Sequence, residues 1–145
     1  MADRPLLTDE DQQQLADLIA ACEHQTSAEI KIFLEPWCWG DPLRRARQKF
    51  KELHLHRTRL RNGLLLYVAY QSHRFAVVGD EGLCQKLPPQ FWEHLRDELI
   101  ELFRKFPLAE ALGHAIRRCG RELSHYFPAV SPNPNELSNT IEFAQ

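Results

Sequence analysis

An unbroken apolar run at residues 64–70 limits what this chain can fold into more than any other feature. Consecutive apolar residues over this length are typical of a strand that is buried on both faces of a sheet. Polar residues 71–73 interrupt the run, and residues 74–78 resume it with β-branched and aromatic side chains. Two such runs around a short polar turn predict a β-hairpin. Because hairpin strands are antiparallel, the segments before the first strand and after the second should lie at the same end of the sheet.

A further strand is expected upstream of this hairpin. Residues 29–35 alternate in polarity, which predicts a half-buried strand, and Phe33 on its polar face suggests partial cover there too. Asp41 can cap the helix that follows, with Pro42 at its first position. This helix returns the chain to the first hairpin strand, so the segment reads as a β-α-β unit, and such units are right-handed in nearly all proteins.

Helical patterns occupy most of the remaining chain. Thr8 and Asp11 have the spacing of a capping box, which predicts a helix start. Apolar residues recur at helical spacing over residues 90–105 and again over 108–126. Helices before, between and after the strands can cover both faces of a sheet. We therefore expect a three-layer α/β/α sandwich whose small mixed sheet has about four strands.

Length and charge narrow the class of protein. The length of 145 residues fits one domain, which we expect at residues 1–128, followed by a Pro-rich tail at 129–145. A net charge of −2 gives no general attraction to nucleic acid. The longest apolar run is far shorter than the roughly 18 residues that cross a bilayer, and the N-terminus has no signal-peptide pattern. We expect a cytoplasmic protein that has no transmembrane segment and does not bind nucleic acid.

Candidate catalytic and metal-binding residues flank the predicted hairpin. Asp80 and Glu81 follow its second strand between two glycines, and adjacent carboxylates offer oxygen ligands to calcium or magnesium. Asn62 precedes the first strand, where its amide could orient a ligand oxygen or a bound water. Asp80 and Asn62 are therefore the candidate catalytic residues. The structural alternatives are a solvated turn at 79–82 and a turn at Asn62 in which Gly63 supplies a positive φ.

A strongly basic segment lies just before the hairpin. Residues 44–61 contain eight Lys or Arg side chains and one acidic side chain, a local charge of about +7. Arg57, Arg59 and Arg61 crowd around the start of the buried strand, and arginine forks bind phosphate oxygens with two hydrogen bonds. These three residues are the candidates for binding a phosphorylated small molecule or an anionic protein surface. The alternative is a solvated helix face followed by a charged loop.

The chain resembles the TPM domain, a family of small α/β domains proposed to be phosphatases. The resemblance covers roughly residues 7–137, and its most specific part is the Asn-Gly pair with the apolar run that follows. The matching stretches are residues 29–32, 58–68, 79–83, 91–92, 120–123, 125–128 and 135–137. Many longer members carry a Gly-aromatic-Gly-Leu-Glu stretch where this chain has Gly-Asp-Glu-Gly-Leu at 79–83. The resemblance implies a three-layer α/β/α domain of the short, soluble, bacterial type.

Two functional hypotheses follow. The resemblance implies an enzyme, a divalent-cation-dependent phosphatase or nucleotide hydrolase of low activity. Because no established nucleophile motif for phosphate ester hydrolysis occurs in the chain, a metal-activated water is the more economical mechanism. The alternative is a non-catalytic interaction module of a membrane-associated or stress-related assembly, which would use Trp37, Trp39 and the Pro-rich tail. An open sheet edge also makes a homo-oligomer possible.

Overall fold

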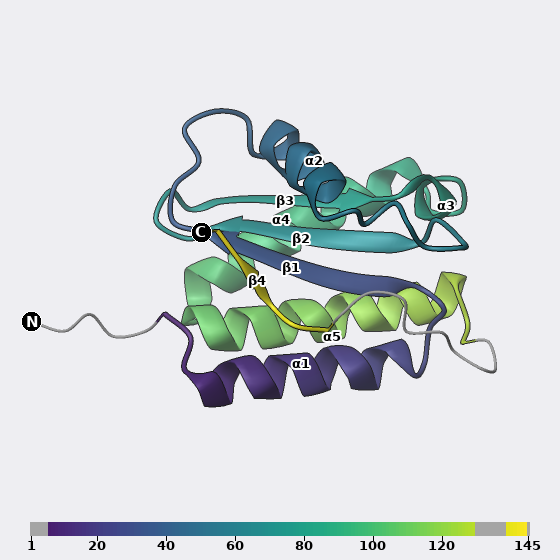
Figure 1. Ribbon diagram of the computed structural model, residues 1–145, viewed down its shortest axis with the longest axis horizontal. Helices are drawn as coiled ribbons and strands as arrows, with labels where there is room; N and C mark the ends of the chain where they lie inside the picture. Colours follow the sequence, from purple (N-terminus) through teal and green to yellow (C-terminus); the bar gives the residue numbers. More distant parts are fainter. Residues whose placement is uncertain (1–5, 130–138, 145) are drawn as a thin grey trace, which may run out of the picture.

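The computed structural model describes residues 6–129 and 139–144 (Figure 1). Helices and strands alternate through the first half of the chain, and two long helices follow them. The elements are α1 (Asp9–Glu23), β1 (Glu29–Glu35), α2 (Pro42–Glu52), β2 (Gly63–Ala69), β3 (Arg74–Gly79), α3 (Glu81–Cys84), α4 (Pro89–Lys105), α5 (Leu108–Tyr126) and β4 (Glu142–Phe143).

The four strands form one mixed sheet in the order β3-β2-β1-β4. The predicted hairpin is confirmed: β2 and β3 are antiparallel, and Leu64 lies opposite Gly79. β1 runs parallel to β2 along its whole length, as the β-α-β prediction requires. β2 thus has neighbours on both sides, and all seven of its residues are buried. Because helices cover both faces of the sheet, alternate residues of β2 face two different cores, and its sequence is continuously apolar rather than alternating.

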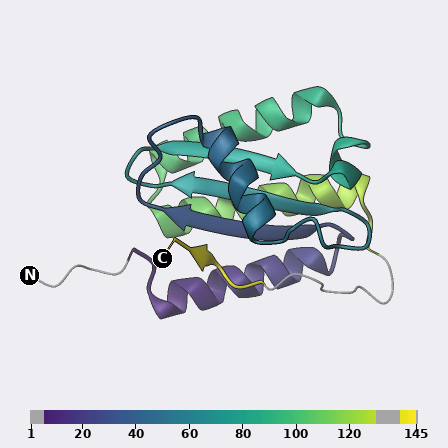
Figure 2. The ribbon, with the colours of Figure 1, turned by 45° about the horizontal axis from the view of Figure 1, so that its top comes forward.

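Helices cover both faces of the sheet (Figures 1 and 2). The larger layer, α1, α4 and α5, packs on one face, where Ile32 and Leu66 belong to the main core. α2 crosses the other face, where Phe33 and Tyr67 belong to a smaller core with Phe50 of α2. Neighbouring residues of a strand point to opposite faces, so each strand contributes to both cores. The domain is therefore the expected three-layer α/β/α sandwich.

The predicted helix starts are also confirmed. The hydroxyl of Thr8 accepts a hydrogen bond from the Asp11 N–H, and the Asp11 carboxylate accepts one from the Thr8 N–H, which completes the capping box of α1. The Asp41 carboxylate caps α2 through the Leu43 N–H, and Pro42 is the first helical residue. Local sequence thus determines where these two helices begin.

The prediction that β1 is half-buried is wrong, because all seven of its residues are buried. The charged side chains of Lys31 and Glu35 are covered and paired instead of solvated. Lys31 donates to Glu142 of β4 at 2.9 Å, and Glu35 accepts two hydrogen bonds from Arg45 of α2 at 2.9 and 3.0 Å. The polar half of the alternating pattern therefore holds neighbouring elements in place, and α2 and β4 exclude water from it.

The last described residues extend the sheet. Part of the expected Pro-rich tail, residues 139–144, contains β4, which pairs in parallel with β1 through Phe33↔Glu142 and Leu34↔Phe143. Ile141, just before β4, is buried in the main core. The middle of the tail, 130–138, lies outside the described residues. Within residues 6–129 and 139–144, no helix is both long and apolar enough to cross a membrane.

Candidate functional site

The polar segments before β2 and after β3 meet at one end of the sheet. The Asp80 N–H donates to the Gly63 carbonyl at 2.9 Å, and the Gly82 N–H donates to the Arg61 carbonyl at 2.8 Å. These backbone bonds hold the two loops against each other. The hairpin thus brings together Arg61, Asn62, Asp80 and Glu81, as its antiparallel pairing predicts.

Two details of this junction differ from the expected turns. The positive φ lies at Arg61, with a value of 51°, and none of the described glycines has a positive φ, so the role expected for Gly63 is wrong. Gly82 is needed for close approach instead, because a Cβ there would lie 2.3 Å from the Leu60 carbonyl oxygen. Glycine at this position lets the loop after β3 touch the loop before β2.

Asp80 is a buried structural partner and not part of a solvated turn. Its side chain is only 5% exposed, and it accepts two hydrogen bonds from Arg61, at 2.8 and 2.9 Å. It also caps α3 by accepting the Glu81 N–H at 2.8 Å. Glu81 lies outside this pair, with its carboxylate 3.4 Å from the Arg61 guanidinium. The bond to Asp80 raises the pKa of Arg61 and keeps it charged.

Asn62 is buried beneath this junction. Its backbone N–H donates to the Thr58 hydroxyl at 3.1 Å, its carbonyl accepts the Glu29 N–H at 3.1 Å, and its amide nitrogen donates to the Ser27 carbonyl. The amide oxygen is buried and has no hydrogen-bond partner among the described residues. These contacts fix the loop before β2 to the loop before β1. A catalytic role for Asn62 stays a prediction.

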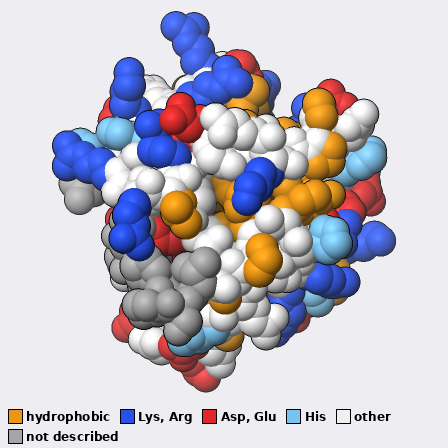
Figure 3. Space-filling model, turned by 90° about the vertical axis from the view of Figure 1, so that its right-hand side faces the viewer, with side chains coloured by type: hydrophobic (Ala, Val, Ile, Leu, Met, Phe, Trp, Pro, Cys, Tyr) orange, Lys and Arg blue, Asp and Glu red, His pale blue; other side chains and the backbone are white. Residues whose placement is uncertain are grey.

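A pocket of about 420 Å³ opens beside the Arg61–Asp80 pair, under the end of α2. Its wall combines four basic side chains with an apolar patch. The lining residues are Arg47, Phe50, Lys51, His56, Arg61, Val78, Gly79 and Asp80. Figure 3 views the molecule from the end where α3 lies, and Lys and Arg side chains gather on its upper part, the side of α2. The pocket therefore suits an anion that carries an apolar group.

Of the three arginines expected to bind phosphate, Arg61 lines this pocket. Arg57 and Arg59 are exposed and lie outside its wall. Arg47 and Lys51 line the wall instead, and the sequence did not identify them as candidates. Their spacing of four residues puts both on one face of α2, and this spacing is the signal that could have identified them.

At the expected metal site, Arg61 occupies the carboxylate of Asp80. Both carboxylate oxygens accept hydrogen bonds from Arg61, so a cation would have to displace a guanidinium. Among residues 6–129 and 139–144, no three His, Cys, Asp or Glu side chains are grouped as metal ligands would be. The metal role of Asp80 and Glu81 stays a prediction that requires Arg61 to move.

Cys84 lies next to the same junction, but its environment does not make it a nucleophile. Its sulfur lies 3.4 Å from the Gly79 carbonyl oxygen. Burial raises the pKa of the Cys84 thiol, and Asp80 adds to this rise, while Arg47 opposes it. Because the thiolate is the reactive form, the thiol of Cys84 is not activated for attack on a phosphate ester.

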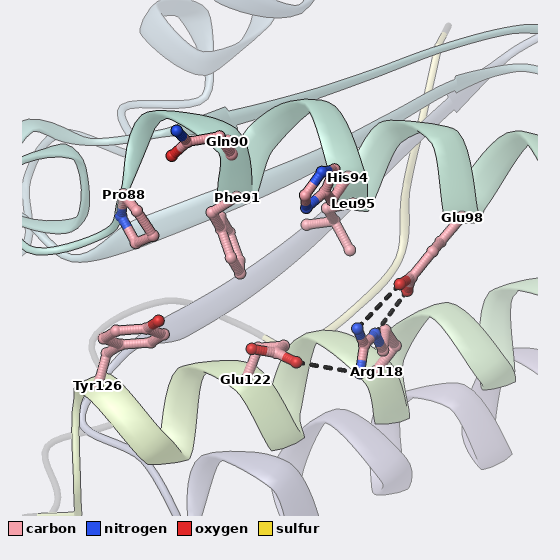
Figure 4. Close-up of a pocket in the computed structure, with 9 residues that line it drawn as sticks. All are labelled: Pro88, Gln90, Phe91, His94, Leu95, Glu98, Arg118, Glu122 and Tyr126. Atoms are coloured by element: carbon pink, nitrogen blue, oxygen red, sulfur yellow. Dashed lines mark hydrogen bonds and ion pairs between the residues drawn. The ribbon is translucent and has the colours of Figure 1, made fainter.

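A second hollow, of about 400 Å³, lies between α4 and α5 (Figure 4). Its charged side chains bind each other: Arg118 donates to Glu98 at 2.5 and 2.8 Å and lies 3.0 Å from Glu122. The apolar end holds Phe91 and Tyr126. Because Arg118 is shared by two carboxylates, this hollow offers a weaker attraction to an anion than the pocket beside Asp80.

The two exposed tryptophans lie at the opposite end of the sheet, between β1 and α2. Trp37 and Trp39 stack with ring centroids 5.3 Å apart and planes 7° apart, and Trp39 is 83% exposed. Their loop is held by the Ser72 hydroxyl, which accepts the Cys38 N–H at 2.9 Å. Arg74 also donates to the Gly40 carbonyl at 2.7 Å. The indoles are thus presented on an ordered loop.

Comparison with known proteins places this architecture in a family. The family model of the TPM domain matches residues 2–122. The NMR structure of the BA42 protein from the psychrophilic bacterium Bizionia argentinensis is similar over 99% of both chains, with a TM-score of 0.90 and 31% identity.

Two more distant NMR structures share the fold. The N-terminal domain of a P. gingivalis protein has a TM-score of 0.65 at 19% identity and covers 86% of this chain and 83% of its own. The N-terminal domain of the cg2496 protein from Corynebacterium glutamicum has a TM-score of 0.62 at 12% identity, with 85% and 86% covered. Comparison with curated proteins gives no match. The extent of the family match and the similarity to BA42 show that this chain belongs to the TPM-domain family.

Proposed function

We propose that this domain binds the phosphate group of a phosphorylated small molecule in the pocket between α2 and the end of β3. The observation that carries the proposal is the convergence of Arg47, Lys51, His56 and Arg61 on one wall of that pocket. Phe50 and Val78 supply an apolar surface for the rest of the ligand. Ligand pockets commonly combine a few polar groups with such a surface.

The charges of the wall match a phosphomonoester. Asp80 neutralises Arg61 and fixes the direction of its guanidinium. Arg47 and Lys51 form no salt bridge with any described residue, so their two positive charges remain for the ligand. A phosphomonoester carries close to two negative charges at neutral pH. The pocket can therefore bind the dianion without leaving a large excess charge.

The geometry of the pocket supports binding of the phosphate group, and hydrolysis of the bound ester is a further step that we propose. A divalent-cation-dependent phosphatase would use Asp80 and Glu81 for the cation and Asn62 for orientation. Arg61 occupies both oxygens of Asp80, so a cation could act at Asp80 only after the guanidinium moves away. Turnover of p-nitrophenyl phosphate, with and without magnesium or calcium, measures whether hydrolysis follows binding.

Calorimetric titration with phenyl phosphate tests the proposed binding. We expect Arg47→Ala and Lys51→Ala each to weaken binding about tenfold, because each removes a charge-assisted contact worth about 1.4 kcal/mol. Arg44→Ala and Lys49→Ala are matched controls, since they remove cations from the same helix that do not line the pocket. Equal losses in all four variants would mean that general attraction to α2, and not the pocket, holds the ligand.

A second candidate function is a non-catalytic interaction module that uses the stacked pair Trp37 and Trp39. The observation that favours it is the ordered loop that presents both indoles to solvent. Rigid tryptophans are common binding hot spots. Affinity capture with the wild-type chain and with a Trp37→Ala, Trp39→Ala variant tests it. A set of captured proteins that is the same for both chains would argue against this function.

A further inference from the structure

The outer edge of β1 is recognised by a very short segment of the chain. β2 pairs with all seven residues of β1 on the inner side, whereas β4 pairs on the outer side at Phe33 and Leu34. Beyond β4, the Ala144 N–H donates to the Leu34 carbonyl at 3.0 Å. The opposite end of this edge is closed by Glu23, whose carboxylate accepts the Ile30 N–H at 2.9 Å. The edge therefore accepts a strand of only a few residues.

Two consecutive side chains give this short pairing its specificity. Ile141 is 4% exposed and belongs to the main core. Glu142 accepts a salt bridge from Lys31 at 2.9 Å, and the Lys31 side chain is itself only 6% exposed. Phe143 follows with 36% exposure. The edge thus selects a segment in which a buried apolar residue is followed by an acidic one, and these two side chains point to opposite faces of the sheet.

The segment pairs with β1 over only two residues. The Glu142 side chain is 38% exposed, so its ion pair with Lys31 is partly screened by solvent. So short a strand pairing can open locally without unfolding of the rest of the domain. The same contacts form again when an identical segment arrives from another molecule, and an exchanged pair of chains buries the same groups.

We propose that the outer edge of β1 is a strand-accepting site that takes the Ile141–Phe143 segment of a second copy of this chain, by reciprocal exchange of β4. Every copy carries both the edge and the segment that pairs with it, so a second copy of the chain is the partner that fits this edge. Within one molecule the segment acts at a high effective concentration, which favours the closed monomer in dilute solution. Exchange becomes favourable when the pairing within each molecule is weakened and the pairing between molecules is retained.

Complementary charge reversal of Lys31 and Glu142 creates that situation. In Lys31→Glu and in Glu142→Lys, like charges face each other within one chain. In a mixture of the two variants, reciprocal exchange pairs opposite charges at both edges. We expect the mixture to show twice the monomer mass by size exclusion with light scattering, at a concentration where each variant alone is monomeric. The double variant Lys31→Glu, Glu142→Lys restores the internal pair and should stay monomeric.

A second measurement does not depend on the buried lysine. A fluorescent peptide of residues 139–144, with the sequence NTIEFA, is titrated against the full-length wild-type and Glu142→Lys chains by anisotropy. We expect at least tenfold tighter binding to the variant, because its own segment competes less well for the edge. The same peptide with lysine in place of its glutamate is the control. The proposal is overturned if the mixture of variants remains monomeric and the peptide binds both chains equally. If circular dichroism finds Lys31→Glu unfolded, the peptide decides alone, and equal binding to both chains then overturns the proposal.

Discussion

Replacing Glu23 with glutamine is expected to change how the stability of this domain depends on pH. Glu23 is 5% exposed at the end of α1, and its carboxylate accepts the Ile30 N–H at 2.9 Å. Burial raises the pKa of Glu23 to about 7, and nearby Glu29 adds to the rise, while the Ile30 hydrogen bond and Lys31 oppose it. The folded domain thus favours the protonated form of Glu23.

The sign of the effect follows from proton binding. Between the ordinary pKa of 4.5 and the folded pKa of about 7, folded Glu23 holds a proton that the unfolded chain has lost. The free energy of unfolding therefore falls as pH rises through this window and stays lower above it. At about 1.4 kcal/mol for each pKa unit, the full loss is about 3 kcal/mol.

Glutamine keeps the shape of protonated glutamate and cannot ionise. Its amide oxygen can accept the Ile30 N–H, so Glu23→Gln should leave stability nearly unchanged at pH 4. At pH 8 it should raise the free energy of unfolding by about 2 to 3 kcal/mol relative to wild type. Urea unfolding followed by tryptophan fluorescence at both pH values measures the difference. Glu10→Gln, an exposed change in the same helix, is the control.

The reasoning is refuted by a gain that is equal at pH 4 and pH 8, because a change in packing alone would not depend on pH. It is equally refuted if Glu23→Gln and Glu10→Gln behave alike at both values. In either case folding would not raise the pKa of Glu23.

Three further predictions concern the contacts that shape the candidate site and the sheet. Gly82→Ala should lower the free energy of unfolding by about 2 kcal/mol, because its Cβ would lie 2.3 Å from the Leu60 carbonyl oxygen. Gly40→Ala, which meets nothing within 4 Å, is the control in urea unfolding, and equal losses would contradict the close approach. Arg45→Ala should cost about 2 kcal/mol, because it leaves the buried Glu35 carboxylate without its cation. Burial would raise the pKa of Glu35, but the hydrogen bonds from Arg45 and Tyr67 outweigh it and hold this pKa below its usual range. The stability that the ion pair contributes is therefore present at neutral pH and is lost as the pH falls through the lowered pKa. An Arg45→Ala loss as large at pH 3 as at pH 7 would count against the ion pair. If a cation binds at Asp80 and Glu81, Arg61→Ala should bind magnesium more tightly than wild type in calorimetry, because Arg61 occupies both oxygens of Asp80. Unchanged affinity would show that the cation does not bind there.

Local patterns in the sequence were sufficient for most of the architecture. The apolar run at residues 64–70 predicted a strand buried on both faces of a sheet, because only in such a strand is every side chain covered. The Thr8 capping box and the Asp41-Pro42 start predicted where α1 and α2 begin. The meeting of Asn62 with Asp80 also followed from the sequence, since a hairpin leaves no other place for the residues that flank it.

The sequence alone left the details of the site open. Arg61 could be named, but its partner could not, because the salt bridge to Asp80 depends on a positive φ and on the close approach of Gly82. Arg47 and Lys51 looked like two more cations on a solvated helix. Only the packing of α2 across the sheet turns their face toward the end of β3.

Long-range pairing decided the rest. Nothing in the Pro-rich tail predicted that Glu142 and Phe143 would extend the sheet. β4 spans two residues, too few for a periodic pattern, and its position depends on Lys31, more than a hundred residues earlier. Local sequence determines a helix or strand when the interactions that stabilise it are made by the residues of that element. Where those interactions come from a distant part of the chain, as for β4 and for the basic pocket, only the tertiary structure decides.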